Sequence, residues 1–391
     1  MKRFLQSIIK KLTKPNMAHF SHSKDEQSRV LECSSALYQN PTLIQRSFMQ
    51  YKCQVHYKSV ASRVLLNSAS LILIIPVVLF LLLKRIRINK NHDADSSSLI
   101  AVYMGVDLGN VPNSINNRYR VMKGSNKVSL SVSDIITVMC NFWRFLGHPY
   151  FILKNVYKTA LFSHNMNVYN PSAIVVTSEY SFTSSWLTQY CRLNNIVHIN
   201  IMHGEKIYNI RDSFFEFDEC FVWDQHYIDL FTSLHASHNQ FKTEIPPKLQ
   251  LNLQTATRTD YSKNQMRLSY YLQNETEQQL NILKDALNKL RNNYHVCLRP
   301  HPVYSNINLL QTIFKEFEIE DPSSINIQQS ISKADFIVSK YSTVLFQGYL
   351  LKKDIIIDDI SDNELFRKLI EFDYIIFRKK HRKLTEMLHG S

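Results

Sequence analysis

The sequence is poor in glycine, which accounts for only 7 of its 391 residues. No G-x-G-x-x-G occurs, so the usual dinucleotide-binding loop is excluded. No G-x-x-x-x-G-K-[ST] occurs either, which excludes a Walker-type nucleoside triphosphatase. A phosphate group must therefore be held in this protein by side chains and helix N-termini rather than by a glycine-rich loop.

Motifs for metal binding and thiol redox chemistry are missing as well. The six cysteines form no C-x-x-C, so a zinc ribbon and a thioredoxin-like pair are excluded, and no H-E-x-x-H is present. Scattered cysteines in a chain of this length indicate buried thiols in a reducing compartment. We expect no metal site and no resident cofactor.

Positive charge is in excess: the chain has 46 lysines and arginines but 33 aspartates and glutamates, so its net charge is +13. Such a chain favours polyanions, anionic lipid or phosphate-bearing ligands as partners. Nucleic-acid binding through charge alone is one alternative. The cations are spread along the chain with no aromatic-interleaved basic motif, so we expect no nucleic-acid partner.

Residues 1–97 form a membrane-associated segment in this interpretation. Residues 2–14 combine helically spaced apolar residues with lysines, which indicates a basic amphipathic helix at a membrane surface or a helix docked on its own protein. The uncharged residues 64–83 are long enough to cross a bilayer, although a buried helix of a soluble domain or a helix lying in the membrane would fit too. Cations just after it place the following domains in the cytoplasm, beyond a polar linker at 89–98.

From residue 98 onward, short apolar strands alternate with amphipathic helices, which predicts an α/β fold of parallel βαβ units. The poorly patterned segment 226–265 contains the boundary between two Rossmann-like domains at 98–235 and 236–391, and we expect them to face one another across a cleft. Strands are predicted at 98–104, 172–177, 197–202, 219–223, 267–272, 294–298, 335–338 and 354–357. Helices are predicted at 132–146, 184–193, 275–291, 306–317 and 342–351.

Ligands of open parallel sheets bind at the carboxyl ends of the strands. In the first domain, Glu179 follows one predicted strand, and His203, Gly204 and Glu205 follow the next. Gly204 permits a tight turn with positive φ, and a histidine beside a carboxylate can act as an acid–base pair. A helix-capping role for the Glu179 segment and a structural role for His203 are the alternatives.

In the second domain, Arg299 and His301 follow a predicted strand, and two prolines bracket the histidine. An arginine and a histidine on a stiff loop suit a diphosphate or a phosphodiester. Ser339 follows a later predicted strand, while Ser342 and Thr343 open a helix, where hydroxyls and free N–H groups can bind phosphate oxygens. Simple N-capping is the alternative and is compatible with phosphate binding.

The strings "VVTSEYS", "IMHGE", "CLRPHP" and "SKYSTVLFQG" are similar to the HG, HP and Ser/Thr motifs of bacterial polysialyltransferase-like and polyol-phosphate-transferase-like enzymes. The chain from about residue 98 resembles these two-domain GT-B enzymes of surface-polysaccharide synthesis. The resemblance implies a nucleotide-activated donor, often a cytidine nucleotide, bound without metal. It implies that His301, Ser342 and Thr343 contact the donor phosphate, while His203 works on the acceptor with Glu205 or Glu179.

These patterns predict an inverting, metal-independent glycosyltransferase at the bacterial inner membrane. Its donor would be a nucleotide-activated sugar, with a CMP-linked sialic-acid- or Kdo-like sugar favoured, and its acceptor a glycan or a lipid-linked glycan of capsule or lipopolysaccharide. A CDP-polyol phosphotransferase of cell-surface polymer synthesis is the first alternative, and a basic nucleic-acid-binding protein is the second.

Overall fold

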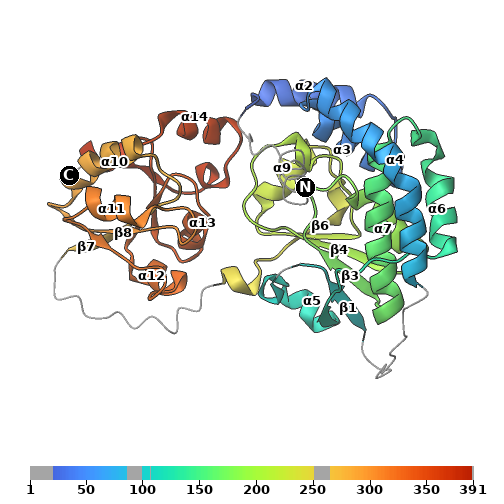
Figure 1. Cartoon of the computed structure of the whole chain (residues 1–391). Coiled ribbons are helices and arrows are strands. Elements are labelled where there is room, and N and C mark those ends of the chain that lie inside the picture. Colours follow the sequence, from blue (N-terminus) through green and yellow to red (C-terminus); the bar gives the residue numbers. More distant parts are fainter. Residues whose placement is uncertain (1–20, 86–98, 106, 251–264, 390–391) are drawn as a thin grey trace. The chain divides into compact units, whose positions relative to one another are not determined.

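The computed structural model describes residues 21–85, 99–105, 107–250 and 265–389 (Figure 1). The predicted amphipathic helix at 2–14 and the linker at 89–98 lie outside the described residues. The described chain forms two compact units. The second unit consists of Gly204–Ile207 and the residues from Pro247 onward. The first unit consists of the remaining residues. The division at Pro246–Pro247 falls inside the poorly patterned segment 226–265.

The first unit is built on a six-stranded sheet in the order β2-β1-β3-β4-β5-β6, in which every neighbouring pair is parallel. Its strands are β1 Ile100–Tyr103, β2 Arg120–Lys123, β3 Ala173–Val176, β4 Val197–Ile201, β5 Glu219–Val222 and β6 Phe241–Thr243. The four strands predicted in this region are thereby confirmed. The strand order reverses between β1 and β3, which makes their carboxyl ends the expected ligand-binding edge.

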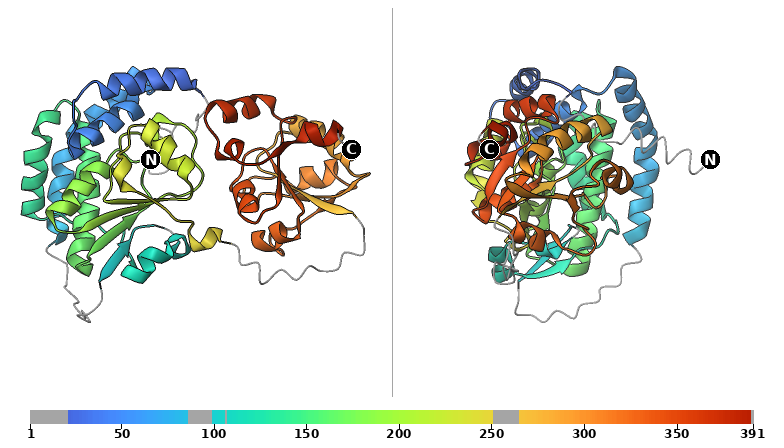
Figure 2. Two further views of the ribbon diagram at one scale, coloured as in Figure 1. Left: turned by 180° about the vertical axis from the view of Figure 1, so that it is seen from behind. Right: turned by 90° about the vertical axis from the view of Figure 1, so that its left-hand side faces the viewer.

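Eight α-helices of the first unit are described: α2 Lys24–Ser35, α3 Leu43–His56, α4 Val60–Arg85, α5 Asn113–Arg118, α6 Val132–Phe142, α7 Pro149–Tyr169, α8 Ser184–Leu193 and α9 Gln225–Ser233. The predicted helices at 64–83, 132–146 and 184–193 are confirmed as α4, α6 and α8. The sequence analysis missed α2, α3, α5, α7 and α9. Helices α4, α6 and α7 lie together on one side of the sheet in opposite views of the molecule (Figures 1 and 2).

The N-terminal helix α3 is an integral part of this unit. The Arg46 guanidinium donates hydrogen bonds to the carbonyls of Phe214 at 3.0 Å and His235 at 2.6 Å. Phe48 and Tyr51, on the same helix, pack against the ring of Phe151 in α7. The hydrogen bonds of Arg46 join α3 to loops that lie more than 150 residues further along the chain.

The second unit contains a six-stranded parallel sheet in the order β12-β11-β10-β7-β8-β9. Its strands are β7 Met266–Tyr271, β8 Tyr294–Arg299, β9 Glu318–Ile319, β10 Phe336–Ser339, β11 Asp354–Ile357 and β12 Arg382–Lys383. Its α-helices are α10 Glu277–Leu290, α11 Ile307–Ile313, α12 Ile327–Lys333, α13 Thr343–Leu350, α14 Asn363–Glu371 and α15 Leu384–His389. Read from β9, this is the Rossmann strand order, whose switch point lies between β7 and β10.

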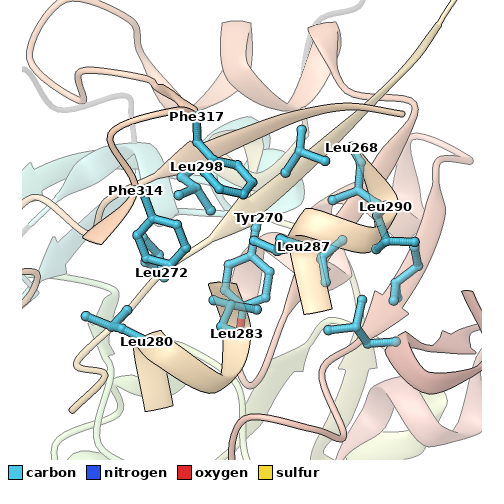
Figure 3. Packing of buried hydrophobic residues seen from close by; sticks show 14 of the residues in the cluster. Leu268, Tyr270, Leu272, Leu280, Leu283, Leu287, Leu290, Leu298, Phe314 and Phe317 are labelled. Carbon is cyan, nitrogen blue, oxygen red and sulfur yellow. The ribbon is translucent and has the colours of Figure 1, made fainter. Parts of the chain in front are cut away.

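The core of the second unit forms where α10 packs on the sheet (Figure 3). A capping box of Thr276 and Gln279 starts this helix. Its leucines recur at helical spacing and pack against β7 and β8. The labelled residues of this cluster in α10, β7 and β8 are Leu280, Leu283, Leu287, Leu290, Leu268, Tyr270 and Leu298. The packing fixes β7, α10 and β8 as one unit, which leaves the loops at the strand ends to carry polar groups.

Candidate active site

Two predicted residues of the first unit lie together at the carboxyl ends of neighbouring strands. Glu179 follows β3 and His203 follows β4, and the Nδ1 atom of His203 lies 3.1 Å from Oε1 of Glu179. The side-chain amide of Asn200 in β4 donates a hydrogen bond of 3.2 Å to the other carboxylate oxygen of Glu179. The side-chain oxygen of Asn200 accepts a hydrogen bond from the backbone amide of Ser178. The pairing of β3 with β4 thus fixes the distance between the two functional groups.

The two side chains of this 3.1 Å contact differ in exposure: Glu179 is 0% exposed and His203 is 47% exposed. A buried carboxylate that receives the Nδ1 proton holds the imidazole in one tautomer and leaves Nε2 as the proton acceptor. The ring of Tyr180 lies against the imidazole at 5.1 Å. Gly204 adopts the positive φ of +66° expected for the turn that follows. The arrangement suits His203 as a general base and Glu179 as its positioning group.

Helix α3 supports the two loops beside this pair. The Gln50 side-chain amide donates to the backbone carbonyls of Glu179 and Arg211, both at 2.9 Å. One turn later, Gln54 donates to the carbonyls of Tyr180 and Arg211 at the same distance. The sequence analysis missed both glutamines, and their only signal is the i, i+4 spacing of two amides on one helix face.

Glu205 belongs to the second unit rather than to the pair in the first. Burial raises the pKa of its carboxyl group to about 8, and a hydrogen bond with Tyr374 opposes this rise. A carboxyl group with this pKa is mostly protonated at pH 7, so it is a poor choice for the base that starts a reaction.

His301 lies at the carboxyl end of β8 in the second unit, as predicted. Its Nδ1 accepts hydrogen bonds from the backbone amides of Val303 at 3.1 Å and Tyr304 at 3.3 Å, and its ring stacks on that of Tyr304 at 4.5 Å. The neutral imidazole therefore carries its proton on Nε2, which can donate to a phosphate oxygen. Burial lowers the pKa of His301, while Glu275 opposes the shift, so the neutral tautomer is favoured.

Ser342 is the N-cap of α13, and its Oγ accepts a hydrogen bond of 3.3 Å from the amide of Val344. Thr343 is the first residue of the helix, and both side chains are half-buried. The first amides of a helix have no partner within the helix and carry partial positive charge. This end of α13 combines hydroxyls with such amides, as the sequence predicts.

Arg299 and Ser339 are turned into the second unit. The Arg299 guanidinium contacts the carboxylate of Glu320 and donates a hydrogen bond of 2.8 Å to the carbonyl of Ile325. Ser339 donates to the carbonyl of Tyr271 at 2.8 Å, and it is buried like Arg299. Their polar groups are engaged within the fold, which favours a structural role for both residues over the predicted contact with a donor.

A buried ion pair that the sequence analysis did not predict lies at the switch point of the second sheet. The Nζ atom of Lys340, just after β10, is 3.4 Å from Oε1 of Glu275, just after β7. Both side chains are almost fully buried, and the carboxylate also accepts hydrogen bonds from the amide of Gln273. The position of Lys340 directly after an apolar strand was the signal available in the sequence, but its partner is 65 residues away.

Within the described parts of the chain, no group of three or more histidine, cysteine, aspartate or glutamate side chains is arranged to hold a metal ion. The expectation of a metal-independent reaction therefore rests on the sequence alone and remains a prediction. So does the division of the chain into an acceptor domain and a donor domain.

No protein-family model and no curated protein matches the sequence. Among solved structures, the chain is similar to the wall teichoic acid polymerase TagF soaked with CDPG, with 10% identity, a TM-score of 0.41, and coverage of 94% of this chain and 88% of that one. It is also similar to S. aureus MnaA with UDP, with 10% identity, a TM-score of 0.43, and coverage of 75% and 90%. A third similar structure is UDP-GlcNAc 2-epimerase from Neisseria meningitidis bound to UDP-GlcNAc, with 11% identity, a TM-score of 0.43, and coverage of 66% of this chain and 81% of that one. Similarity at this level identifies neither a donor nor an acceptor.

Proposed function

We propose that the chain is an inverting, metal-independent glycosyltransferase that uses a nucleotide-activated sugar, with a CMP-linked sugar of the sialic-acid or Kdo type favoured. The observation that carries this proposal is the buried Glu179 carboxylate holding the exposed His203 imidazole at the carboxyl ends of β3 and β4. A positioned base of this kind is what the deprotonation of an acceptor hydroxyl requires.

In this mechanism, Nε2 of His203 takes the proton of the acceptor hydroxyl as its oxygen attacks the anomeric carbon. Glu179 stabilises the imidazolium that forms, because its carboxylate lies 3.1 Å from Nδ1. General-base catalysis of this type contributes about 10²–10⁴-fold to a rate. Of the three acceptor-side candidates, His203 is thus the base, Glu179 is the positioning group and Glu205 has no part in the proton transfer.

On the donor side, the Nε2–H of His301, the hydroxyls of Ser342 and Thr343 and the first amides of α13 bind the phosphate of the leaving nucleotide. These groups stabilise the negative charge that develops when the glycosidic bond to the nucleotide breaks. Arg299 and Ser339 stabilise the strands that carry this site rather than contacting the donor.

A CDP-polyol phosphotransferase remains the second candidate, and one observation favours it. The base is an imidazole rather than a free carboxylate, and the same His203–Glu179 pair can activate a hydroxyl for attack on phosphorus. The two candidates differ in their product, because one forms a glycoside and the other a phosphodiester.

We place the enzyme at the cytoplasmic face of a bacterial inner membrane, where a lipid-linked glycan would be its acceptor. Among the described residues, one helix, Val60–Lys84, is long and apolar enough to cross a membrane. The net charge of +13 favours anionic lipid on the same side.

The proposal is tested by assaying the full chain with CMP-sugar and CDP-polyol donors on glycan and lipid-linked acceptors. We expect His203→Ala to lower kcat by about 10²–10⁴-fold, while the matched control His238→Ala, an exposed histidine in the same unit, keeps wild-type activity. Phosphorus NMR of the product distinguishes the two candidates, since only the phosphotransferase adds a phosphodiester. Wild-type turnover in His203→Ala would overturn the assignment of the base.

A further inference from the structure

Large exposed apolar side chains gather on two helices of the first unit. On α4 they are Leu71, Ile72, Leu73, Ile75, Leu79, Phe80 and Leu83, and on α6 and the short turn after it they are Val132, Ile136, Met139, Trp143 and Leu146. The second set recurs every three to four residues and so forms one outward stripe. Exposed apolar side chains in this number mark an interaction site rather than ordinary surface.

Helix α4 does not leave the fold, although its length would allow it to cross a bilayer. One side packs on α7: Leu81 is buried, and the side-chain carbonyl of Asn67 accepts a hydrogen bond of 3.3 Å from the amide of Tyr150. The carbonyl of Leu81 also accepts one of 3.2 Å from the amide of Leu130, just before α6. A spanning helix would lose these contacts, so the geometry places α4 along the side of the unit (Figures 1 and 2).

The charge around these helices is of one sign. Residues 33–92 contain no aspartate or glutamate, and residues 108–178 contain one, Asp134. Asp134 is buried and accepts hydrogen bonds from Ser163 and Tyr190 inside the fold. Two cations lie over aromatic rings at the edge of the apolar surface, Lys84 over Phe80 at 4.8 Å and Arg144 over Trp143 at 5.0 Å. An apolar surface with a purely cationic rim complements an anionic lipid surface.

We propose that α4 and α6 together form a docking face that lies flat in the headgroup region of an anionic bilayer, with α4 in the membrane plane rather than across it. The apolar side chains of both helices enter the acyl boundary, while Lys84 and Arg144 extend to the lipid phosphates. The inference rests on the first unit alone and does not depend on the reaction proposed above.

Flotation of the full chain with vesicles of phosphatidylcholine, with and without phosphatidylglycerol, tests this face. The decisive variant is Ile136→Glu with Met139→Glu on α6, because a helix α4 that crossed the membrane by itself would bind whether or not α6 is apolar. We expect this variant to lose about tenfold or more in vesicle partitioning. The matched control Ile370→Glu changes a similarly exposed isoleucine on α14 and is expected to bind like the wild type.

Binding is also expected to weaken by about tenfold or more without phosphatidylglycerol, because the cations beside the apolar side chains then have no anionic lipid to attract. Tryptophan fluorescence in urea checks that the α6 variant is folded, and Ile136→Ser with Met139→Ser replaces it if it is not. Wild-type partitioning of a folded α6 variant would show that α4 spans or that α6 is not in the interface. Equal binding to vesicles with and without phosphatidylglycerol would show that the cations do not contribute to docking. Either of these two results overturns the proposal.

Discussion

Two histidines in and after β4 show how the surroundings of a residue decide its chemistry. His203 follows the strand, is half exposed and pairs with a buried carboxylate. His198 lies within the strand, is fully buried, and pairs through Nδ1 with the hydroxyl of Thr188 at 2.8 Å. The imidazole of His203 is open to proton exchange with solvent or a ligand. The imidazole of His198 is kept neutral by burial against the apolar rings of Phe162 and Phe217.

Glu179→Gln tests the division of roles within the candidate pair. The amide keeps the volume of the side chain but loses the charge that stabilises an imidazolium, so we expect kcat to fall by about 10-fold to 10³-fold with little change in KM. A merely structural role for Glu179 would lower the stability of the fold but leave kcat of the folded variant unchanged. Glu244→Gln serves as the control, because this carboxylate follows β6 and accepts a hydrogen bond from the amide of Ser114.

His198 predicts a pH dependence of stability. Burial lowers its pKa to about 3, so below pH 6.5 the unfolded chain binds a proton that the folded chain does not. Stability is therefore present in full above pH 6.5 and falls as the pH drops toward 3, by about 2 kcal/mol from this group at pH 5.

Urea unfolding at pH 7 and pH 5 measures this dependence through tryptophan fluorescence. The three tryptophans, Trp143, Trp186 and Trp223, all belong to the first unit and therefore report on it. His198→Gln should flatten the dependence by about the stated amount. An unchanged difference between the two pH values would mean that the imidazole is protonated in the fold.

At the scale of helices and strands, local pattern was enough for most elements. Short β-branched runs bounded by polar residues predicted β1, β3, β4, β10 and β11, because strands buried on both faces of a parallel sheet read as apolar runs. Helix α7 was missed because α4, α6 and the sheet cover several of its sides, so it lacks the apolar stripe of a surface helix. Helix α9 was missed although Asp224 caps it and its buried residues Tyr227, Ile228, Leu230 and Phe231 recur at helical spacing.

The site was predictable in position but not in role. Strand ends identified Glu179, His203 and His301, because the carboxyl edge of a parallel sheet follows from topology. The structure adds that Glu179 is fully buried beside His203 and that the Arg299 guanidinium contacts Glu320. Such pairings join residues distant in sequence, as does the support of the Glu179 loop by Gln50, so a single sequence does not show them.

Helix α13 must approach its sheet closely, and Gly348 makes this possible. A Cβ atom at this position would lie 2.5 Å from Cδ1 of Ile337 in β10 and 2.9 Å from Cδ1 of Ile355 in β11. We expect Gly348→Val to destabilise the second unit by about 1–3 kcal/mol in calorimetry and to displace the helix end that carries Ser342. Gly147→Val is the control, since nothing lies within 4 Å of its Cβ. Equal melting of the two variants would contradict this packing.

At the scale of the whole molecule, the two units carry different chemistry. The first holds the His203–Glu179 pair and the exposed apolar side chains of α4 and α6. The second has the Rossmann strand order and carries hydrogen-bond donors, a helix N-terminus and the Lys340–Glu275 pair at its switch point, which suits an activated nucleotide. This division predicts that substitutions in the second unit change nucleotide binding without altering His203.

A thermal-shift panel of CMP, CDP, UDP and GDP tests that division. A nucleotide that binds only the folded protein at about 100 times its Kd stabilises it by about 2.7 kcal/mol. A response to CMP alone favours a sialic-acid- or Kdo-like donor, and a response to CDP favours a polyol phosphate. His301→Ala removes a hydrogen-bond donor to a charged phosphate, so the affinity for the nucleotide should fall by about 10-fold to 100-fold. Two controls should bind the nucleotide as the wild type does. They are His389→Ala, which changes an exposed histidine of the same unit, and His203→Ala. A response to UDP or GDP only would exclude the cytidine donor, and equal shifts in His301→Ala and wild type would remove His301 from the phosphate site.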